Sequence, residues 1–269
     1  MAGEKQESCS SRTLDGWTLV SGAGSGIGAA LAAAFAAAGH AVVLTDVDAD
    51  AARQQATLLR ARGYPAEGLT LDVTSAAEVE RVITSLEASG KPISVLINNA
   101  GLQHVSRLED FPPERWGLLV DVMLKGPAML TRACLPGMRR LGYGRVINIG
   151  SLHSLVASPY KSAYIAAKHG LLGLAKTVAL ETGDTDITIN TLCPGYVRTP
   201  LVERQIAAQA REHGLPEERV VQEIMLRPMP KKSFITVDEL AALALFLCTD
   251  AARNITAQAI AIDGGWTAA

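Results

Sequence analysis

The sequence predicts an α/β fold in which helices cover both faces of one doubly wound parallel sheet. Strand-like and helix-like segments alternate along the chain, as expected for parallel strands joined by crossover helices. The first strand runs into a glycine-rich turn that opens a helix, a strand–turn–helix connection typical of doubly wound sheets. Hydrophobic residues make up 48% and charged residues 19% of the 269 residues. The chain can therefore bury a sizeable core.

Each strand is predicted from a short apolar run that stops at a polar or turn residue. In chain order the predicted strands are Trp17–Val20, Ala41–Thr45, Gly68–Leu71, Ile93–Ile97, Arg145–Ile149, Ile187–Leu192 and Ala259–Ile262. The predicted helices are Gly26–Ala38, Asp50–Arg62, one capped by Ser75, one after Pro113, one leading to Arg140, Ser158–Leu180 and Val237–Leu247.

No composition change divides the chain, so residues 13–269 are predicted to form a single domain. Residues 1–12 are predicted to be a disordered tail. The stretch Arg198–Lys232 is polar, helical in parts and interrupted by prolines. It is the least sheet-like part of the chain, and we expect it to form a helical lid over a substrate site.

Composition and charge argue against several classes of function. A net charge of −2 disfavours a nucleic-acid surface, which needs clustered Lys and Arg. The polar start of the chain predicts no secretory signal, and the alanine-rich run Gly28–Ala38 is shorter than the ~20 residues that span a bilayer. The cysteines, Cys9, Cys134, Cys193 and Cys248, lack metal-ligand spacing. We expect a cytoplasmic protein with reduced thiols and no metal, nucleic acid or membrane partner.

The glycine-rich turn is a candidate nucleotide site. It has the pattern Gly22-x-x-x-Gly26-Ile27-Gly28, with Ser25 inside it. Glycines let the backbone approach a pyrophosphate, and the helix N-terminus favours negative charge. A tight strand-to-helix turn without a ligand is the alternative. The acidic residue that follows favours the nucleotide.

That acidic residue is Asp46, which follows the second predicted strand and lies 18 residues beyond Gly28. A carboxylate in this place accepts hydrogen bonds from an adenosine ribose and repels a 2′-phosphate. No arginine lies beside it, and Asp48 makes the local sequence acidic. The pattern therefore predicts NAD in preference to NADP.

A tyrosine and a lysine one helical turn apart form a candidate catalytic pair. Tyr164 and Lys168 share a helix face. A phenol has a pKa near ~10, and a neighbouring ammonium group favours the phenolate and lowers that pKa. Ser151, thirteen residues upstream, can donate a hydrogen bond to a reacting oxygen. The spacing alone is weak, but the upstream glycine-rich turn makes a chance match implausible.

Together with Asn98-Asn99-Ala100-Gly101 and Pro194-Gly195, these motifs resemble the short-chain dehydrogenase/reductase family. They occur in order and cover nearly the whole chain from Leu14 to Trp266. The resemblance is strongest to members that interconvert D-3-hydroxybutyrate and acetoacetate with NAD. It rests on the stretches Leu102–His104, Glu109–Pro112, Leu155–Tyr164, Cys193–Glu203 and Asp263–Trp266. It implies a Rossmann-type homotetramer.

The resemblance also implies a role for each site residue. Tyr164 is the general base or acid, Ser151 holds the reacting oxygen, and Lys168 binds the nicotinamide ribose and lowers the tyrosine pKa. The implied cofactor contacts are made by Tyr164, Lys168 and Gly22, Ser25, Gly26, Ile27, Gly28, Asp46, Asp72, Val73, Asn99, Ala100, Gly101, Pro194, Gly195 and Val197.

The implied substrate is a small carboxylate, whose pocket needs hydrogen-bond donors and preferably one cation. By resemblance, these polar roles belong to Gln103, His153, Lys161 and Gln205, and Trp266 lines the wall. Ser151 and Tyr164 contact the reacting oxygen. Lys161 as a solvated charge and Gln205 as an exposed lid residue are the alternatives.

One departure from the family pattern is serious. Met123 stands where the family usually has an asparagine that helps to hold a water linking Lys168 to solvent. Ser21, where threonine is usual, is a milder change. Two alternatives stay open: a related dehydrogenase for another small hydroxy acid or alcohol, and a non-catalytic relative that binds NAD without turnover.

Overall fold

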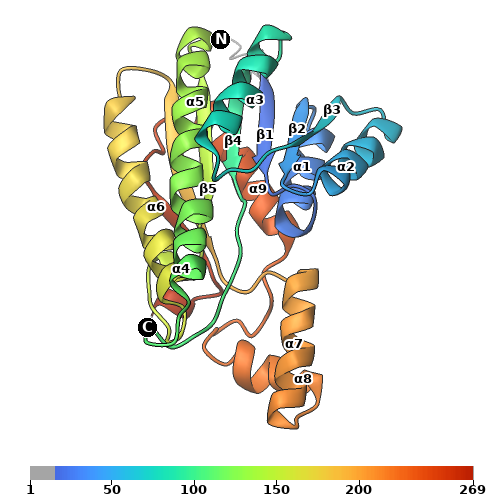
Figure 1. Ribbon diagram of the computed structural model, residues 1–269, viewed down its shortest axis with the longest axis vertical. Coiled ribbons are helices and arrows are strands. Elements are labelled where there is room, and N and C mark those ends of the chain that lie inside the picture. Colours follow the sequence, from blue (N-terminus) through green and yellow to red (C-terminus); the bar gives the residue numbers. More distant parts are fainter. Residues whose placement is uncertain (1–15, 269) are drawn as a thin grey trace, which may run out of the picture.

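The computed structural model describes residues 16–268, and its strands form one parallel sheet (Figure 1). The strands are β1 (Trp17–Ser21), β2 (Val42–Asp46), β3 (Ala66–Thr70), β4 (Ile93–Asn98), β5 (Gly144–Ile149), β6 (Ile187–Pro194) and β7 (Ala259–Ile262). Their order in the sheet is β3-β2-β1-β4-β5-β6-β7. The predicted fold class is confirmed. The chain order reverses between β1 and β4, where doubly wound sheets bind ligands at the carboxyl ends of the strands.

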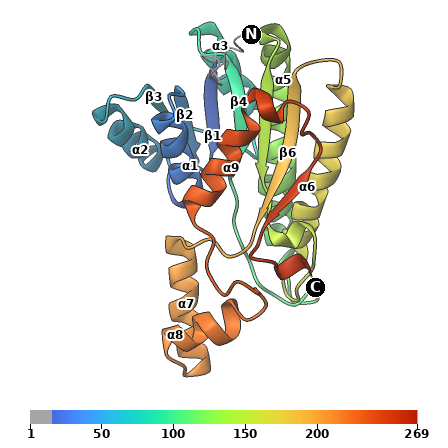
Figure 2. The same ribbon diagram turned by 180° about the vertical axis from the view of Figure 1, so that it is seen from behind.

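Helices cover both faces of this sheet, with α3, α5 and α6 on one face and α1 and α9 on the other (Figures 1 and 2). The helices are α1 (Gly26–Ala37), α2 (Ala49–Ala61), α3 (Ala76–Ala88), α4 (Pro113–Val120), α5 (Gly126–Leu141), α6 (Ser162–Glu181), α7 (Pro200–His213), α8 (Glu217–Arg219) and α9 (Val237–Leu247). Two π-helical turns span Asp121–Lys125 and Val220–Met225, and single 3₁₀ turns span Leu152–Ser154, Asp250–Ala252 and Trp266–Ala268. The predicted tail, residues 1–12, lies outside the described residues.

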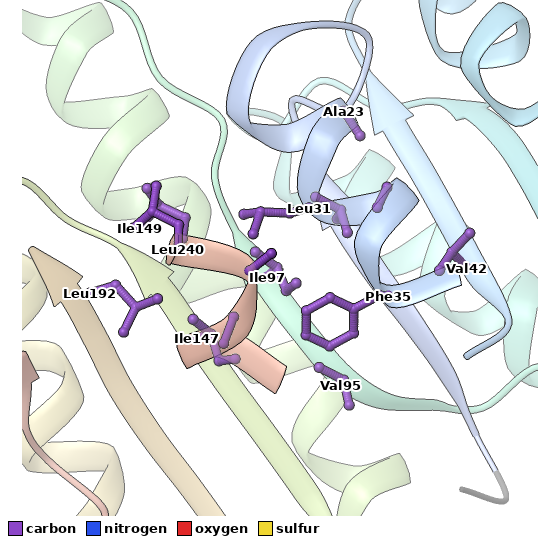
Figure 3. Packing of buried hydrophobic residues seen from close by; sticks show 14 of the residues in the cluster. Ala23, Leu31, Phe35, Val42, Val95, Ile97, Ile147, Ile149, Leu192 and Leu240 are labelled. Atoms are coloured by element: carbon purple, nitrogen blue, oxygen red, sulfur yellow. The ribbon is translucent and has the colours of Figure 1, made fainter. Parts of the chain in front are cut away.

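The core consists of two apolar layers because successive strand residues face opposite sides of the sheet. Leu19 of β1 packs with α3, α5 and α6, and its neighbour Val20 packs with α1 and α9. Figure 3 shows the second layer, where Phe35 of α1 lies among strand residues such as Val95 and Ile97. Phe35 is fully buried, and burial of one such side chain contributes roughly 1.5–3 kcal/mol. This packing fixes the strand ends that carry the site.

Three differences from the predicted elements have a physical reason, and the remaining strand and helix ends agree to within two residues. Helix α6 begins at Ser162 and not at Ser158, because Pro159 and Tyr160 form a turn in which Tyr160 takes a positive φ of 68°. Strand β3 spans Ala66–Thr70 and not Gly68–Leu71, because the full length of β2 pairs with it. The two helices predicted after Pro113 are one continuous helical path, in which the π-helical turn Asp121–Lys125 joins α4 to α5.

The segment predicted as a lid contains α7, α8 and the π-helical turn Val220–Met225, and it projects beyond the carboxyl edge of the sheet (Figures 1 and 2). It has an apolar cluster of its own, whose buried members are Val202, Ile206, Val220 and Met225. A single β-bridge between Val197 and Ile235 closes its base. Helix α7 and the π-helical turn therefore share this separate cluster, whereas Leu226 and Met229 near the end of the segment belong to the main core beside α9.

Candidate active site

The glycine-rich turn connects β1 to α1, and its shape requires glycine at several positions. Gly22 has a φ of +64°, and a Cβ there would lie 2.8 Å from the Ala100 Cα. A Cβ on Gly28 would lie 2.3 Å from the Gly22 carbonyl oxygen. Ser25 precedes the helix in an extended conformation without capping it, and Ile27 packs partly against the core. The first-turn N–H groups can therefore serve an anion, so the turn fits the pyrophosphate of a dinucleotide.

The start of the loop after β4 holds this turn in place. The side-chain amide of Asn99 donates to the carbonyl oxygens of Ser21 (2.9 Å) and Gly22 (3.0 Å). The backbone N–H groups of Asn99 and Ala100 donate to the Ser21 hydroxyl at 3.0 and 3.2 Å. Ser21 thus keeps the hydroxyl that threonine usually supplies. Asn99 supports the turn through its side chain, and Gly101 follows it at the strand edge.

The Asp46 carboxylate lies at the end of β2 beside the same turn. One oxygen accepts a hydrogen bond from the Gly24 N–H at 2.9 Å, and the other accepts from the Asp48 N–H at 3.0 Å. A Cβ on Gly24 would lie 2.9 Å from that first oxygen. Each carboxylate oxygen can accept a further bond. Asp46 therefore both orders the turn and remains able to accept from a ribose.

The remaining predicted cofactor residues lie along the same carboxyl edge. Asp72 accepts hydrogen bonds from the N–H and hydroxyl of Thr74, at 2.9 and 2.7 Å. Val73 is buried against Gly126 at the start of α5. At the other end of the sheet, Pro194 is the last residue of β6, the Gly195 N–H donates to the Ile262 carbonyl oxygen, and Val197 makes the bridge to Ile235.

The structure brings Ser151, Tyr164 and Lys168 together. The Ser151 hydroxyl lies close enough to the Tyr164 phenol to lower its pKa. The Lys168 ammonium nitrogen lies 5.6 Å from the centre of the Tyr164 ring and donates to the Ile149 carbonyl oxygen at 2.6 Å. Lys168 is only 5% exposed. A phenol, a hydroxyl and an ammonium group thus share one corner where β5 and α6 meet.

Burial controls the charge states in this corner. Burial raises the pKa of the Tyr164 phenol, and the nearby Ser151 hydroxyl opposes that shift. Burial lowers the pKa of Lys168 to about 8. The sequence predicted that Lys168 would lower the tyrosine pKa. In this structure the net shift is upward, because removal from water outweighs the neighbouring groups.

A second polar cluster adjoins the first. The Nε2 atom of His153 lies 3.5 Å from the Lys161 amine and 3.4 Å from the Ser158 hydroxyl. The His153 ring centre lies 6.4 Å from that of Tyr164 and 6.5 Å from that of Trp266. Burial, reinforced by the Lys161 charge, lowers the pKa of His153 to about 4. His153 is therefore a neutral hydrogen-bonding group beside a cation.

Two predicted substrate residues lie outside this cluster. Gln103 lies in the loop between β4 and α4, and its side-chain oxygen accepts a hydrogen bond from the His104 N–H at 3.0 Å. Gln205 lies on α7 in the projecting segment. Among the described residues, no hydrogen bond links either glutamine to His153 or Lys161. Contacts thus join His153 to Lys161 and Trp266, and in the described part of the chain the two glutamines make no hydrogen bond to this cluster.

Met123 lies in the π-helical turn between α4 and α5 and is 1% exposed. It belongs to an apolar cluster with Phe111, Leu119, Ala163 and Ala167, against which the Tyr164 ring packs. A thioether fills this space but offers only a weak hydrogen-bond acceptor.

Sequence reasoning assigned no role to Tyr196 or Ser154. The Tyr196 ring lies 5.9 Å from Trp266 and extends the aromatic wall. Ser154 caps the backbone of Ser151. The Ser151-x-x-Ser154 spacing was a visible signal, because it matches a reciprocal helix cap.

Within residues 16–268, no group of three or more His, Cys, Asp or Glu side chains is placed to hold a metal ion. Cys134, Cys193 and Cys248 are buried free thiols. In the same range, no helix is both long and apolar enough to cross a bilayer.

The fold and this site define a dehydrogenase class, and comparison with known proteins agrees. A family described as "Enoyl-(Acyl carrier protein) reductase" matches residues 22–267. The chain belongs to the short-chain dehydrogenase/reductase family and is an oxidoreductase. Membership implies a nicotinamide cofactor and a small substrate.

Two relatives carry a more specific name. A D-beta-hydroxybutyrate dehydrogenase of Rhizobium meliloti is 49% identical over 73% of this chain and 76% of its own length. A D-beta-hydroxybutyrate dehydrogenase of Cupriavidus necator is 44% identical over 82% of this chain and 85% of its own length. A crystal structure of a proposed gluconate dehydrogenase from Agrobacterium tumefaciens is similar with a TM-score of 0.87 at 29% identity, and the match covers 94% of this chain and 96% of that one.

Proposed function

We propose that this protein interconverts D-3-hydroxybutyrate and acetoacetate by hydride transfer with NAD. The observation that carries the proposal is the position of Lys161 and His153 beside Tyr164. A half-buried cation and a neutral imidazole next to a proton-transfer group suit a hydroxyl and a carboxylate separated by a short carbon chain. The names of the two relatives support the same substrate.

In the proposed oxidation, the C3 hydroxyl loses a proton and C3 loses a hydride. A bound NAD, held by the turn Gly22–Gly28 and by Asp46, would supply the hydride acceptor. The Tyr164 phenolate accepts the hydroxyl proton, while Ser151 donates a hydrogen bond to the same oxygen as it becomes a carbonyl. In the reduction, Tyr164 returns the proton. Lys168 keeps its ammonium group close to the phenol and stabilises the phenolate.

The proposed substrate pose follows from the charges. Lys161 binds the carboxylate, and His153, whose Nε2 lies 3.5 Å from the Lys161 amine, contacts the carboxylate beside it. Trp266 limits the space beyond the carboxylate. Gln103 and Gln205 complete the donors when the segment 198–232 closes over the substrate as a lid. Residues 13–269 then act as one NAD-binding catalytic domain.

The decisive assay is NADH formation with D- and L-3-hydroxybutyrate, each supplied with NAD and with NADP. Turnover of the D isomer with NAD supports the proposal. Gluconate is included in the assay because of the structural similarity to the proposed gluconate dehydrogenase. Turnover only of other hydroxy acids or alcohols would establish the alternative of a related dehydrogenase. NAD binding without turnover of any of them would establish a non-catalytic relative.

Cofactor choice gives a first prediction. Asp46→Asn should reduce the preference for NAD over NADP. Two like charges about 4 Å apart near a protein surface repel by about 4 kcal/mol, so we expect a change of roughly tenfold or more in the ratio of the two kcat/KM values. Asn can still accept from the Gly24 N–H.

The matched control is Asp48→Asn, which removes the same charge two residues away. Asp48 caps α2, and asparagine caps equally well. If Asp48→Asn relaxes the preference as strongly as Asp46→Asn, the discrimination comes from the general field and not from contact with the 2′-phosphate.

The pH dependence gives a second prediction. Oxidation needs the Tyr164 phenolate, and burial raises the pKa of that phenol, so oxidation should accelerate as the pH rises. Reduction needs the protonated phenol. Burial lowers the pKa of Lys161 and that of Lys168, so both directions should weaken when these amines lose charge. We expect a bell-shaped profile of kcat/KM for oxidation and a profile that falls with rising pH for reduction. A reduction rate that rises with pH would contradict this assignment.

The third prediction concerns Met123. If the usual asparagine supports a water path from Lys168, Met123→Asn should raise turnover or shift its pH dependence and leave NAD affinity unchanged. The variant buries an amide in an apolar cluster, so its melting temperature should fall. Met123→Leu, which adds no polar atom, is the control. Equal pH profiles for all three proteins would mean that this path does not limit the rate.

Assembly and location are also part of the proposal. We propose a homotetramer in the cytoplasm, by analogy with the family the chain resembles. Sedimentation equilibrium of the purified protein tests the tetramer directly, and a monomer at assay concentrations would refute it.

A further inference from the structure

The backbone of Ser151 is locked by a neighbouring hydroxyl. Ser151 directly precedes the short 3₁₀ helix Leu152–Ser154, which is one turn long. Its N–H donates to the Ser154 hydroxyl at 3.2 Å, and its carbonyl oxygen accepts from the Ser154 N–H at 2.7 Å. Ser154 therefore holds both backbone polar groups of Ser151.

This cap sets the position of the Ser151 hydroxyl. The Ser151 oxygen accepts a hydrogen bond from the His153 N–H at 3.1 Å. A hydroxyl has one proton and two lone pairs. With one lone pair engaged by the backbone N–H, the Ser151 proton stays free to turn toward the Tyr164 phenol or, with substrate bound, toward the reacting oxygen. The Ser151 oxygen is therefore held in place before substrate arrives.

The Ser154 hydroxyl is itself held on several sides. Ser154 is 1% exposed, and a Cβ on Gly150 would lie 2.9 Å from its oxygen. Its hydroxyl also lies near the thiol of Cys193 on β6, which donates to the Thr191 carbonyl oxygen at 3.9 Å. Ser154 thus ties the loop after β5 to the neighbouring strand.

We propose that Ser154 is a positioning residue for proton transfer, which holds the Ser151 hydroxyl in line with Tyr164. Ser154 touches neither the substrate nor the cofactor in this scheme and acts only through Ser151. The inference rests on the proposed function, because it takes Ser151 and Tyr164 to act on the reacting oxygen.

The test is Ser154→Ala and Ser154→Gly, which both remove the hydroxyl without adding bulk. We expect kcat to fall roughly tenfold, since small misplacements of catalytic groups cost one to two orders of magnitude. The acid limb of the oxidation profile should move to higher pH, because Ser151 no longer lowers the phenol pKa as well. The dissociation constant of NAD should stay unchanged. Thr182→Val, which removes another buried hydroxyl at the far end of α6, is the control for loss of stability alone.

A double variant separates positioning from general support. If Ser154 acts through Ser151, adding Ser154→Ala to Ser151→Ala should cause no further loss of kcat. Additive losses, or an unchanged pH profile in both Ser154 variants, would overturn the inference. Normal turnover in Ser151→Ala would instead refute the proposed role of Ser151. A loss in Ser151→Ala with parental behaviour in both Ser154 variants would refute this inference alone.

Discussion

Replacing Tyr164 with phenylalanine is expected to lower kcat by about 10²–10⁴-fold, the usual contribution of a general acid–base group. The phenol supplies the only proton-transfer atom in the proposed scheme, and phenylalanine lacks it. The ring should keep its place because it packs on the cluster around Met123 and Ala163. Steady-state rates with D-3-hydroxybutyrate and NAD measure the effect, and calorimetric titration with NAD should show nearly unchanged affinity.

Tyr160→Phe is the matched control, because Tyr160 is four residues away in sequence and exposed on a turn. It should keep the parental rate. Near-normal turnover in Tyr164→Phe would show that another group transfers the proton. Loss of NAD binding together with turnover would show that the phenol is needed for cofactor binding.

The second large effect is expected at Lys161. A hydrogen bond to a charged group contributes about 1.5–3 kcal/mol, so Lys161→Ala should raise the KM for D-3-hydroxybutyrate roughly ten- to a hundredfold. An uncharged analogue, the methyl ester of the substrate, should be affected much less. Removal of the amine should also raise the pKa of His153, because the Lys161 charge contributes to lowering it.

The control is Lys176→Ala. Lys176 is an exposed lysine on α6, the helix that Lys161 directly precedes, and its loss should leave both KM values unchanged. Lys161→Arg should keep part of the affinity, because it retains the charge with a different shape. An equal rise in KM for the acid and the ester would give Lys161 a structural role and remove the main support for a carboxylate substrate.

The strands and their succession along the chain could be predicted, because each strand follows from a local sequence pattern. Apolar runs such as Ile93–Ile97 and the glycine pattern at Gly22–Gly28 each specify one local structure. Boundaries that depend on neighbouring strands were harder. Residues 66–70 of β3 carry a weak pattern of their own and form a strand because β2 pairs with them. The start of α6 depends on the unusual conformation of Tyr160, which the sequence does not announce.

The site, too, has features that the sequence predicts and features that depend on tertiary structure. The spacing of Tyr164 and Lys168 placed both on one helix face, but their charge states depend on burial, which spacing does not reveal. His153 and Lys161 come together because the turn before α6 folds back toward β5, a tertiary contact. Gln205 lies on a segment whose position relative to the sheet depends on contacts beyond its own sequence.

The base of the projecting segment has an evolutionary consequence. The Val197–Ile235 bridge and two backbone hydrogen bonds, from Arg198 to Ile235 and from Ile235 to Tyr196, join its two ends at one point. Its apolar cluster lies almost wholly between those ends. Natural variation can therefore replace the helices in between as an exchangeable module, while the cofactor platform and proton-transfer corner stay intact. Chimaeras cut at this base offer a direct route to new substrate ranges.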